Sequence, residues 1–169
     1  MNTKTSFLKI IIISTILLIM TSLVSCSAEW RLRHIKIYPT ADFNIKNHRL
    51  SIAPFQCEIP SIGQIVSDAV AANLSDSGVI LISEPDKDAE YLLEGTVAVT
   101  TITKGRFLVK FASAGQVTYI ASASCKIIDL STGQVVMSLT FGKAIKLEGA
   151  TELGEVIAEA IKREMRRKK

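Results

Sequence analysis

Apolar residues follow a helical spacing in one part of the chain and a strand spacing in another. Between residues 60 and 77 they recur every three or four positions, which predicts an amphipathic helix. Short apolar runs at 49–55 and 79–82 predict strands on either side of it. A strand, a helix and a strand in this order predict a parallel, right-handed βαβ unit.

The ends of these elements carry local signals. Pro54 ends the first strand, because proline has no N–H to donate to a sheet. Pro60 and Ser61 begin the helix, and Ser61 with Gln64 three positions later has the pattern of a capping box. Gly78 follows the last helical turn and predicts a left-handed end.

From Tyr91 onward apolar and polar residues alternate, which is typical of strands with one buried face. Gly95 predicts a bulge or a point of close approach in the first of these strands. The alternation predicts strands at about 91–103, 107–111, 117–127 and 135–141. The predicted buried face of the third strand consists of Val117, Tyr119, Ala121, Ala123, Cys125 and Ile127.

A hairpin and a second helix complete the predicted fold. Residues 129–133 read Asp-Leu-Ser-Thr-Gly, which predicts a hairpin turn. The last helix begins near Thr151, with acids in its first turn and bases in its last, as the helix dipole favours. Its apolar stripe consists of Leu153, Val156, Ile157, Ala160 and Ile161. The sequence thus predicts an α+β fold, a mixed β-sheet (the βαβ unit followed by antiparallel strands) packed against two helices.

Length and charge suggest how the chain is organised. Residues 49–165 are enough for a single domain with its own core. Residues 27–48 are polar and predict a spacer, which allows one short strand at 35–38. The formal net charge is +4, and residues 166–169 form a basic tail. This tail either contacts anionic lipid head groups or is a hydrated helix end.

The N-terminus has the pattern of an export signal. Lys4 and Lys9 precede an apolar segment at residues 10–20. This segment is shorter than the roughly 20 residues that a membrane-spanning helix needs. An uncleaved anchor helix that ends near Val24 is the alternative.

The sequence Leu-Val-Ser-Cys at 23–26 resembles the lipobox of bacterial lipoproteins. The resemblance implies a signal peptide at 1–25, cleavage between Ser25 and Cys26, and acyl chains on Cys26. Residues 26–48 would then be the acylated cysteine and its spacer. Ser27 stands where an aspartate would favour the inner membrane, so the resemblance implies the periplasmic face of the outer membrane.

Three segments of the predicted domain resemble a superfamily of bacterial lipoproteins. They read Ile-Ala-Pro-Phe at 52–55, Ala-Glu-Tyr-Leu-Leu-Glu-Gly-Thr-Val at 89–97 and Ile-Ile-Asp-Leu-Ser-Thr-Gly-Gln-Val-Val at 127–136. The superfamily includes curli-secretion lipoproteins, penicillin-binding-protein activator lipoproteins and flagellar outer-membrane lipoproteins, with a core similar to the TolB amino-terminal domain. The chain lacks the additional pore-forming segments of the curli proteins, and its spacer is shorter than that of the activators.

This resemblance implies a non-enzymatic binding or assembly module of the cell envelope, of the secretion or surface-appendage type. An activator of a peptidoglycan synthase and an auxiliary lipoprotein of a lipid-trafficking ABC transporter are the alternatives. The implied partners are the membrane, through the acyl chains, and another envelope protein. Self-association is one form that such binding can take.

The residues give no sign of a catalytic or metal site. His34 and His48 are the only histidines, and both fall in the predicted spacer as solvated residues. The sequence has no glycine-rich phosphate loop, no G-x-S-x-G and no H-E-x-x-H. We therefore expect no catalytic residue, no metal, no cofactor apart from the covalent lipid, and no nucleic-acid partner.

Two further features stay open at the level of sequence. Cys57 and Cys125 can form a disulfide in an oxidising periplasm, or Cys125 can be a buried free thiol on its strand. Lys104, Arg106 and Lys110 surround a predicted strand connection and form either a partner surface or a solvated hairpin tip.

Replacement of Cys26 by serine tests the lipid anchor. The lipobox resemblance predicts that the variant is misprocessed, incorporates no labelled palmitate and leaves the membrane fraction. Mass spectrometry and fractionation of wild type and Cys26→Ser measure both effects. An unchanged mass and an unchanged fractionation would contradict acylation at this residue.

Overall fold

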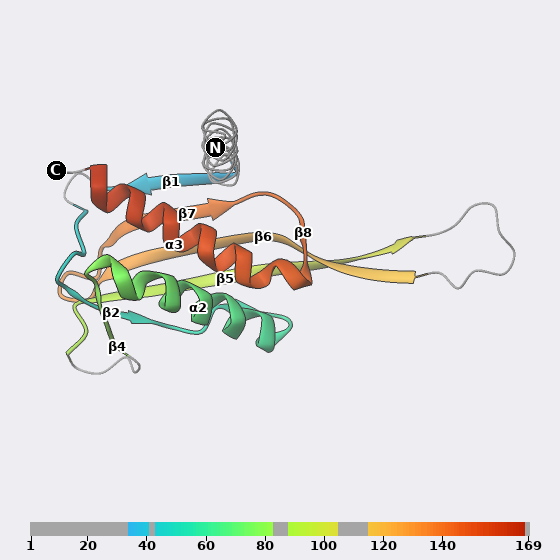
Figure 1. Cartoon of the computed structure of the whole chain (residues 1–169), viewed down its shortest axis with the longest axis horizontal. Coiled ribbons are helices and arrows are strands. Elements are labelled where there is room, and N and C mark those ends of the chain that lie inside the picture. Colours follow the sequence, from blue (N-terminus) through green and yellow to red (C-terminus); the bar gives the residue numbers. More distant parts are fainter. Residues whose placement is uncertain (1–33, 41–42, 83–87, 105–114, 168–169) are drawn as a thin grey trace, which may run out of the picture. The chain divides into compact units, whose positions relative to one another are not determined.

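One mixed β-sheet with two helices on one face makes up the part of the chain that the computed structural model describes, residues 34–40, 43–82, 88–104 and 115–167 (Figure 1). It belongs to the compact unit His34–Lys169. The strands are β1 (Ile35–Pro39), β2 (Arg49–Ile52), β3 (Gln56–Cys57), β4 (Ile80–Ile82), β5 (Tyr91–Lys104), β6 (Gly115–Asp129), β7 (Val135–Phe141) and β8 (Ile145–Lys146). The helices are α2 (Pro60–Leu74) and α3 (Ala150–Arg167), with short 3-10 turns η1 (Ser75–Ser77) and η2 (Leu147–Gly149).

The strand order confirms the predicted α+β class. The main path is β1-β7-β6-β5-β2-β4, while β3 pairs with β5 and β8 pairs with β6. β2 is parallel to β4 and to β5, as the predicted βαβ unit requires. The long strand β6 is antiparallel to both of its neighbours, β5 and β7.

The start of α2 differs from the prediction. The residue before the helix is Ile59, which makes no side-chain cap, and Pro60 occupies the first turn. Ser61 therefore already lies inside the helix, and Gln64 donates a hydrogen bond to Asp68 instead of reaching back. The predicted capping box is wrong because the fixed φ of proline starts the helix one residue earlier.

The folded domain begins before residue 49. Residues Ile35–Pro39 form β1, which pairs with β7 at the edge of the sheet. Phe43 and Ile45 are completely buried in the core. The short strand allowed at 35–38 is thus present, but the stretch from Ile35 onward belongs to the folded domain and not to a spacer, because Ile35, Phe43 and Ile45 are buried in it.

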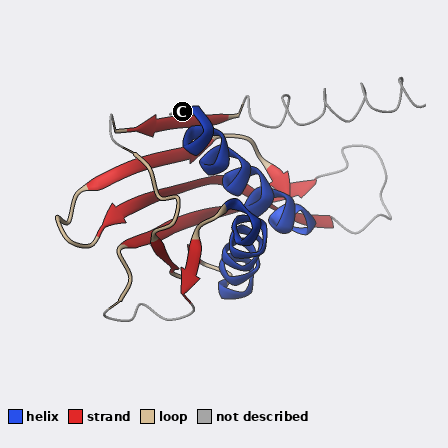
Figure 2. Ribbon diagram, turned by 60° about the vertical axis from the view of Figure 1, so that its left-hand side comes forward, coloured by secondary structure: helices blue, strands red, loops and turns tan. Residues whose placement is uncertain are grey.

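Both helices pack on the same face of the sheet (Figure 2). All five residues of the predicted α3 stripe are buried. A Cβ at Gly154 of α3 would lie 2.5 Å from the Cβ of Ala69 in α2, so glycine lets the helices approach closely. Glu164, also buried, accepts a hydrogen bond from Arg167 at 3.1 Å.

Gly95 is a point of close approach, which is one of the two roles predicted for it. A Cβ at this position would lie 2.3 Å from Cε1 of Phe55, whose ring is buried. The bulge lies elsewhere, in β6, where Ala121 is the extra residue opposite Ala98 and Val99 of β5.

This bulge reverses the predicted face of the first half of β6. Ala123, Cys125 and Ile127 are buried as predicted, but before them the buried residue is Ile120 rather than Tyr119. An extra residue in one strand inverts the alternation of side chains beyond it.

The hairpin after β6 forms as predicted. Gly133 has φ +70°, and the backbone N–H of Gly133 donates to the carbonyl of Asp129 at 2.7 Å. The Asp129 carboxylate accepts hydrogen bonds from Ser131 and Thr132. The hydrogen bond from the Ser131 hydroxyl contributes most to lowering the pKa of Asp129 below its usual value.

Gly95→Ala tests the close approach. We expect it to lower the free energy of unfolding by about 1–3 kcal/mol, because the new methyl group overpacks the core against Phe55. Gly142→Ala is the matched control, since a Cβ there meets nothing within 4 Å. Urea denaturation measures both. Equal stability of the two variants would show that residue 95 has room for a side chain.

Candidate binding surfaces

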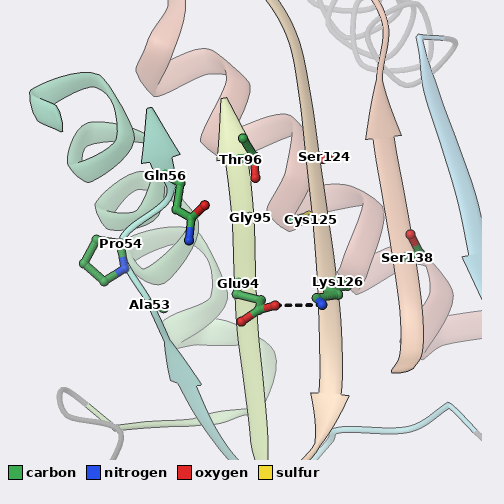
Figure 3. Close-up of a pocket in the computed structure, with 10 residues that line it drawn as sticks. All are labelled: Ala53, Pro54, Gln56, Glu94, Gly95, Thr96, Ser124, Cys125, Lys126 and Ser138. Carbon is green, nitrogen blue, oxygen red and sulfur yellow. Dashed lines mark ion pairs between the residues drawn. The ribbon is translucent and has the colours of Figure 1, made fainter. Parts of the chain in front are cut away.

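A polar hollow of about 300 Å³ lies on the sheet face opposite the helices (Figure 3). It spans the junction of β2, β3, β5, β6 and β7. The residues that line it are Ala53, Pro54, Gln56, Glu94, Gly95, Thr96, Ser124, Cys125, Lys126 and Ser138. The sequence pattern did not single out its polar members. Most of them alternate along the strands with the buried apolar residues that the pattern did predict, and their side chains point to the opposite face of the sheet.

One ion pair crosses the hollow. Lys126 Nζ lies 2.8 Å from Glu94 Oε1, and the two residues are direct cross-strand partners. Both side chains are half exposed, so the pair contributes at most about 1 kcal/mol. Around it, hydroxyl and amide groups offer hydrogen bonds to a polar ligand or to a polar partner surface.

Cys125 contributes backbone to this hollow, but its thiol lies on the helix side of the sheet. There it adjoins a small apolar space with Leu139 and Ile157. Burial raises the pKa of the Cys125 thiol to about 12. The group therefore stays protonated at neutral pH and is a poor nucleophile.

Cys57 and Cys125 are both free thiols. Cys57 pairs with Val97 on one side of β5, and Cys125 pairs with Gly95 on the other side. Two strand spacings, about 9–10 Å, separate them, whereas disulfide Cα atoms lie within about 7 Å. The predicted bridge is therefore corrected in favour of its alternative, the free thiol.

A second polar cluster lies at the end of the sheet where β2 and β5 begin. His48 Nδ1 is 3.1 Å from Glu90 Oε2, which also accepts the backbone N–H of Arg49 at 2.8 Å. This backbone hydrogen bond is the largest cause that lowers the pKa of Glu90. The His48 ring meets Tyr91 edge-on, with centroids 5.4 Å apart. His48 is thus anchored to the domain and is not a spacer residue, although its side chain is 43% exposed to water.

The far ends of β5 and β6 form a two-stranded ribbon, defined here as residues 98–104 and 115–118. It extends past the ends of both helices (Figure 1). β2 and β3 pair with β5 no farther than Val97, and β8 pairs with β6 no farther than Tyr119. In the described part of the chain, both edges of this ribbon are therefore open. Ile102 on the ribbon is 50% exposed.

Of the residues predicted for lipid attachment, signal cleavage and the partner surface, only Lys104 lies in the described part of the chain. Lys104 is the last residue of β5, at the end of the ribbon. Arg106, Lys110, Ser25 and Cys26 lie outside the described residues, so the lipid attachment and the full partner surface stay predictions.

The described residues contain neither a cluster of metal ligands nor a helix that could span a membrane. Between residues 34 and 167, apart from the gaps stated above, no group of three or more His, Cys, Asp or Glu side chains could hold a metal ion. In the same residues, neither helix has the length and apolar composition needed to cross a bilayer.

Comparison with known proteins identifies the fold. No protein-family model and no curated protein matches the chain. Two PelC dodecamers from Paraburkholderia phytofirmans are among the similar solved structures, both with a TM-score of 0.51. One, a point variant, is 18% identical and covers 76% of this chain and 95% of its own. The other is 16% identical and covers 76% and 96%.

A minor lipoprotein from Acinetobacter baumannii also matches, with 16% identity over 70% of this chain and 92% of its own. Its TM-score of 0.38 is too low to establish a shared fold. The chain thus shares the PelC fold over most of its length. Its place in the bacterial lipoprotein superfamily stays a prediction.

Thiol labelling tests the arrangement of the cysteines. In the unfolded, unreduced mature protein we expect both Cys57 and Cys125 to react with a maleimide. In the folded protein Cys57 should react first, because Cys125 is buried. Mass spectrometry of the labelled peptides assigns each site. A sample that reacts only after reduction would contradict the free thiols.

Proposed function

We propose that the chain is a non-enzymatic assembly domain of the bacterial cell envelope, anchored by acyl chains on Cys26 to the periplasmic face of the outer membrane. It binds other envelope proteins, and first of all further copies of itself, through the ribbon. This is the type of activity expected of a secretion or surface-appendage component.

The open edges of the ribbon carry this proposal. Unpaired backbone N–H and C=O groups on an edge strand are a template for the addition of another strand. A two-stranded ribbon is only marginally stable by itself in water. The exposed Ile102 side chain adds an apolar surface that a partner strand would cover.

The ribbon also leads to the residues that the sequence offers as a partner surface. Lys104 ends β5, and Arg106 and Lys110 follow it in the chain. In the sequence these cations lie at the end of the ribbon strand or follow it. Their charges would favour a partner with acidic groups at the matching positions.

Self-association has support from the fold comparison. PelC, which shares this fold, was solved as a dodecamer. We propose that this chain also self-assembles. The proposal does not include the number of copies.

A permanent membrane anchor fits such a role. One acyl chain holds a protein to a bilayer only marginally, whereas two or more hold it stably. Confinement to a surface raises the effective concentration of each copy, so weak contacts between ribbons can suffice for assembly.

A non-enzymatic role agrees with the chemistry of the described side chains. The Cys125 thiol is buried with a raised pKa. His48 is held by Glu90 at the end of the sheet, half exposed to water. Both groups therefore have structural contacts that account for them.

Ile102→Lys tests assembly through the ribbon. A charge on the open edge should block strand addition and convert the assembled protein to monomers. Leu130→Lys is the matched control, because Leu130 is 45% exposed and lies in the hairpin at the other end of β6. Light scattering of the mature protein in detergent, with crosslinking in isolated membranes, measures the oligomeric state.

Wild type and Leu130→Lys should assemble alike. A monomeric wild type in membranes would contradict self-association. Capture of a peptidoglycan synthase or an ABC transporter subunit in its place would favour the corresponding alternative.

A further inference from the structure

A hollow of about 410 Å³ lies where three segments of the chain meet. Lys46 comes from the loop before β2, Asp76 and Ser77 from η1, and Lys162, Met165 and Arg166 from the last turns of α3. Its size is within the range of sites for small ligands, which is about 300–1,000 Å³.

Positive charge predominates in this hollow. Lys46, Lys162 and Arg166 face one carboxylate, that of Asp76. Within the described residues, no salt bridge is formed by any of the three cations. Three like charges gathered in this way repel one another, and a bound anion would relieve the repulsion.

The position of Lys46 is fixed by the fold rather than by chance. The Asn47 N–H donates to the Gly78 carbonyl at 2.8 Å, and the Lys46 N–H donates to Asn44 Oδ1 at 3.0 Å. Gly78 has φ +81°, and the Lys46 side chain lies across it, with Cε 3.3 Å from the position of an added Cβ. The loop is therefore held so that Lys46 extends along the wall of the hollow.

The helix dipole accounts for only some of these charges. Cations in the last turns of a helix are stabilised by its negative end, which explains Lys162 and Arg166 on α3. Lys46 belongs to another segment, more than a hundred residues away in sequence. Asp76 and the negative end of α3 oppose an anion, but three cations outnumber the one carboxylate.

We infer that this hollow binds a phosphate-bearing anion, either the phosphate of a lipid head group or a soluble phosphate ester. Arg166 can donate two parallel hydrogen bonds to phosphate oxygens, and the two lysines supply point charges. Met165 forms the apolar wall against which the rest of a ligand would pack. The site does not depend on assembly through the ribbon.

The test compares two variants that lose the same charge on the same helix. Lys162→Gln removes a cation from the hollow, whereas Arg163→Gln removes the exposed cation beside it, which does not line the hollow. Lys46→Gln removes a cation of the other segment. The mature protein is studied in a non-ionic detergent at constant ionic strength, and its unfolding temperature without ligand verifies that each variant folds.

Two probes distinguish the sources of the anion. Inorganic phosphate is titrated by calorimetry, and phosphatidylglycerol or phosphatidylcholine is added to the micelles while thermal unfolding is followed. Phosphate should bind wild type and Arg163→Gln alike, and Lys162→Gln and Lys46→Gln about tenfold more weakly. That result supports a soluble phosphate ester.

A rise in unfolding temperature with phosphatidylglycerol alone, in wild type and Arg163→Gln but not in the other two variants, supports a lipid head group. Equal responses of Lys162→Gln and Arg163→Gln to both probes would mean non-specific attraction and overturn the inference. So would the absence of any response in wild type.

Discussion

The contact between Phe55 and Gly95 joins the two halves of the domain. The Phe55 ring fills the space that a side chain at residue 95 would need, and its carbonyl oxygen lies 1.9 Å from where a Cβ of Gly63 would be. One buried residue thus fixes α2 on one side and β5 on the other. The βαβ unit and the antiparallel strands therefore share a rigid junction, and the polar hollow lies on the opposite face of this same junction.

The bulge in β6, opposite Ala98 and Val99 of β5, separates a packed region of these two strands from an exposed one. Up to Val97, β5 has strands on both sides and its apolar side chains face the helices. Beyond Val99, its register with β6 is shifted and only β6 accompanies it. The extra residue therefore marks the place where the sheet narrows to a ribbon with open edges, on which the proposed assembly depends.

Sequence periodicity predicted what depends on regular spacing. The α3 stripe, the βαβ unit and the Asp129 hairpin all follow local rules, and all are present. The errors arose where distant contacts decide. The stretch assigned to a spacer belongs to the domain because β1 pairs with β7, Ile120 is buried because of a bulge, and His48 is held by Glu90. The hollows are the least predictable features, since their residues come from segments that only the fold brings together.

The first strand of the domain is completed by one of the last. A hydrogen bond from Thr40 to Val136 spans 96 positions, and all of β1 depends on β7 in the same way. Closing so long a loop is slow and cannot occur until nearly the whole chain is available. This order of events would suit the export that the N-terminal sequence predicts. In an exported chain the sheet would stay incomplete during translocation, and the final pairing would take place on the far side.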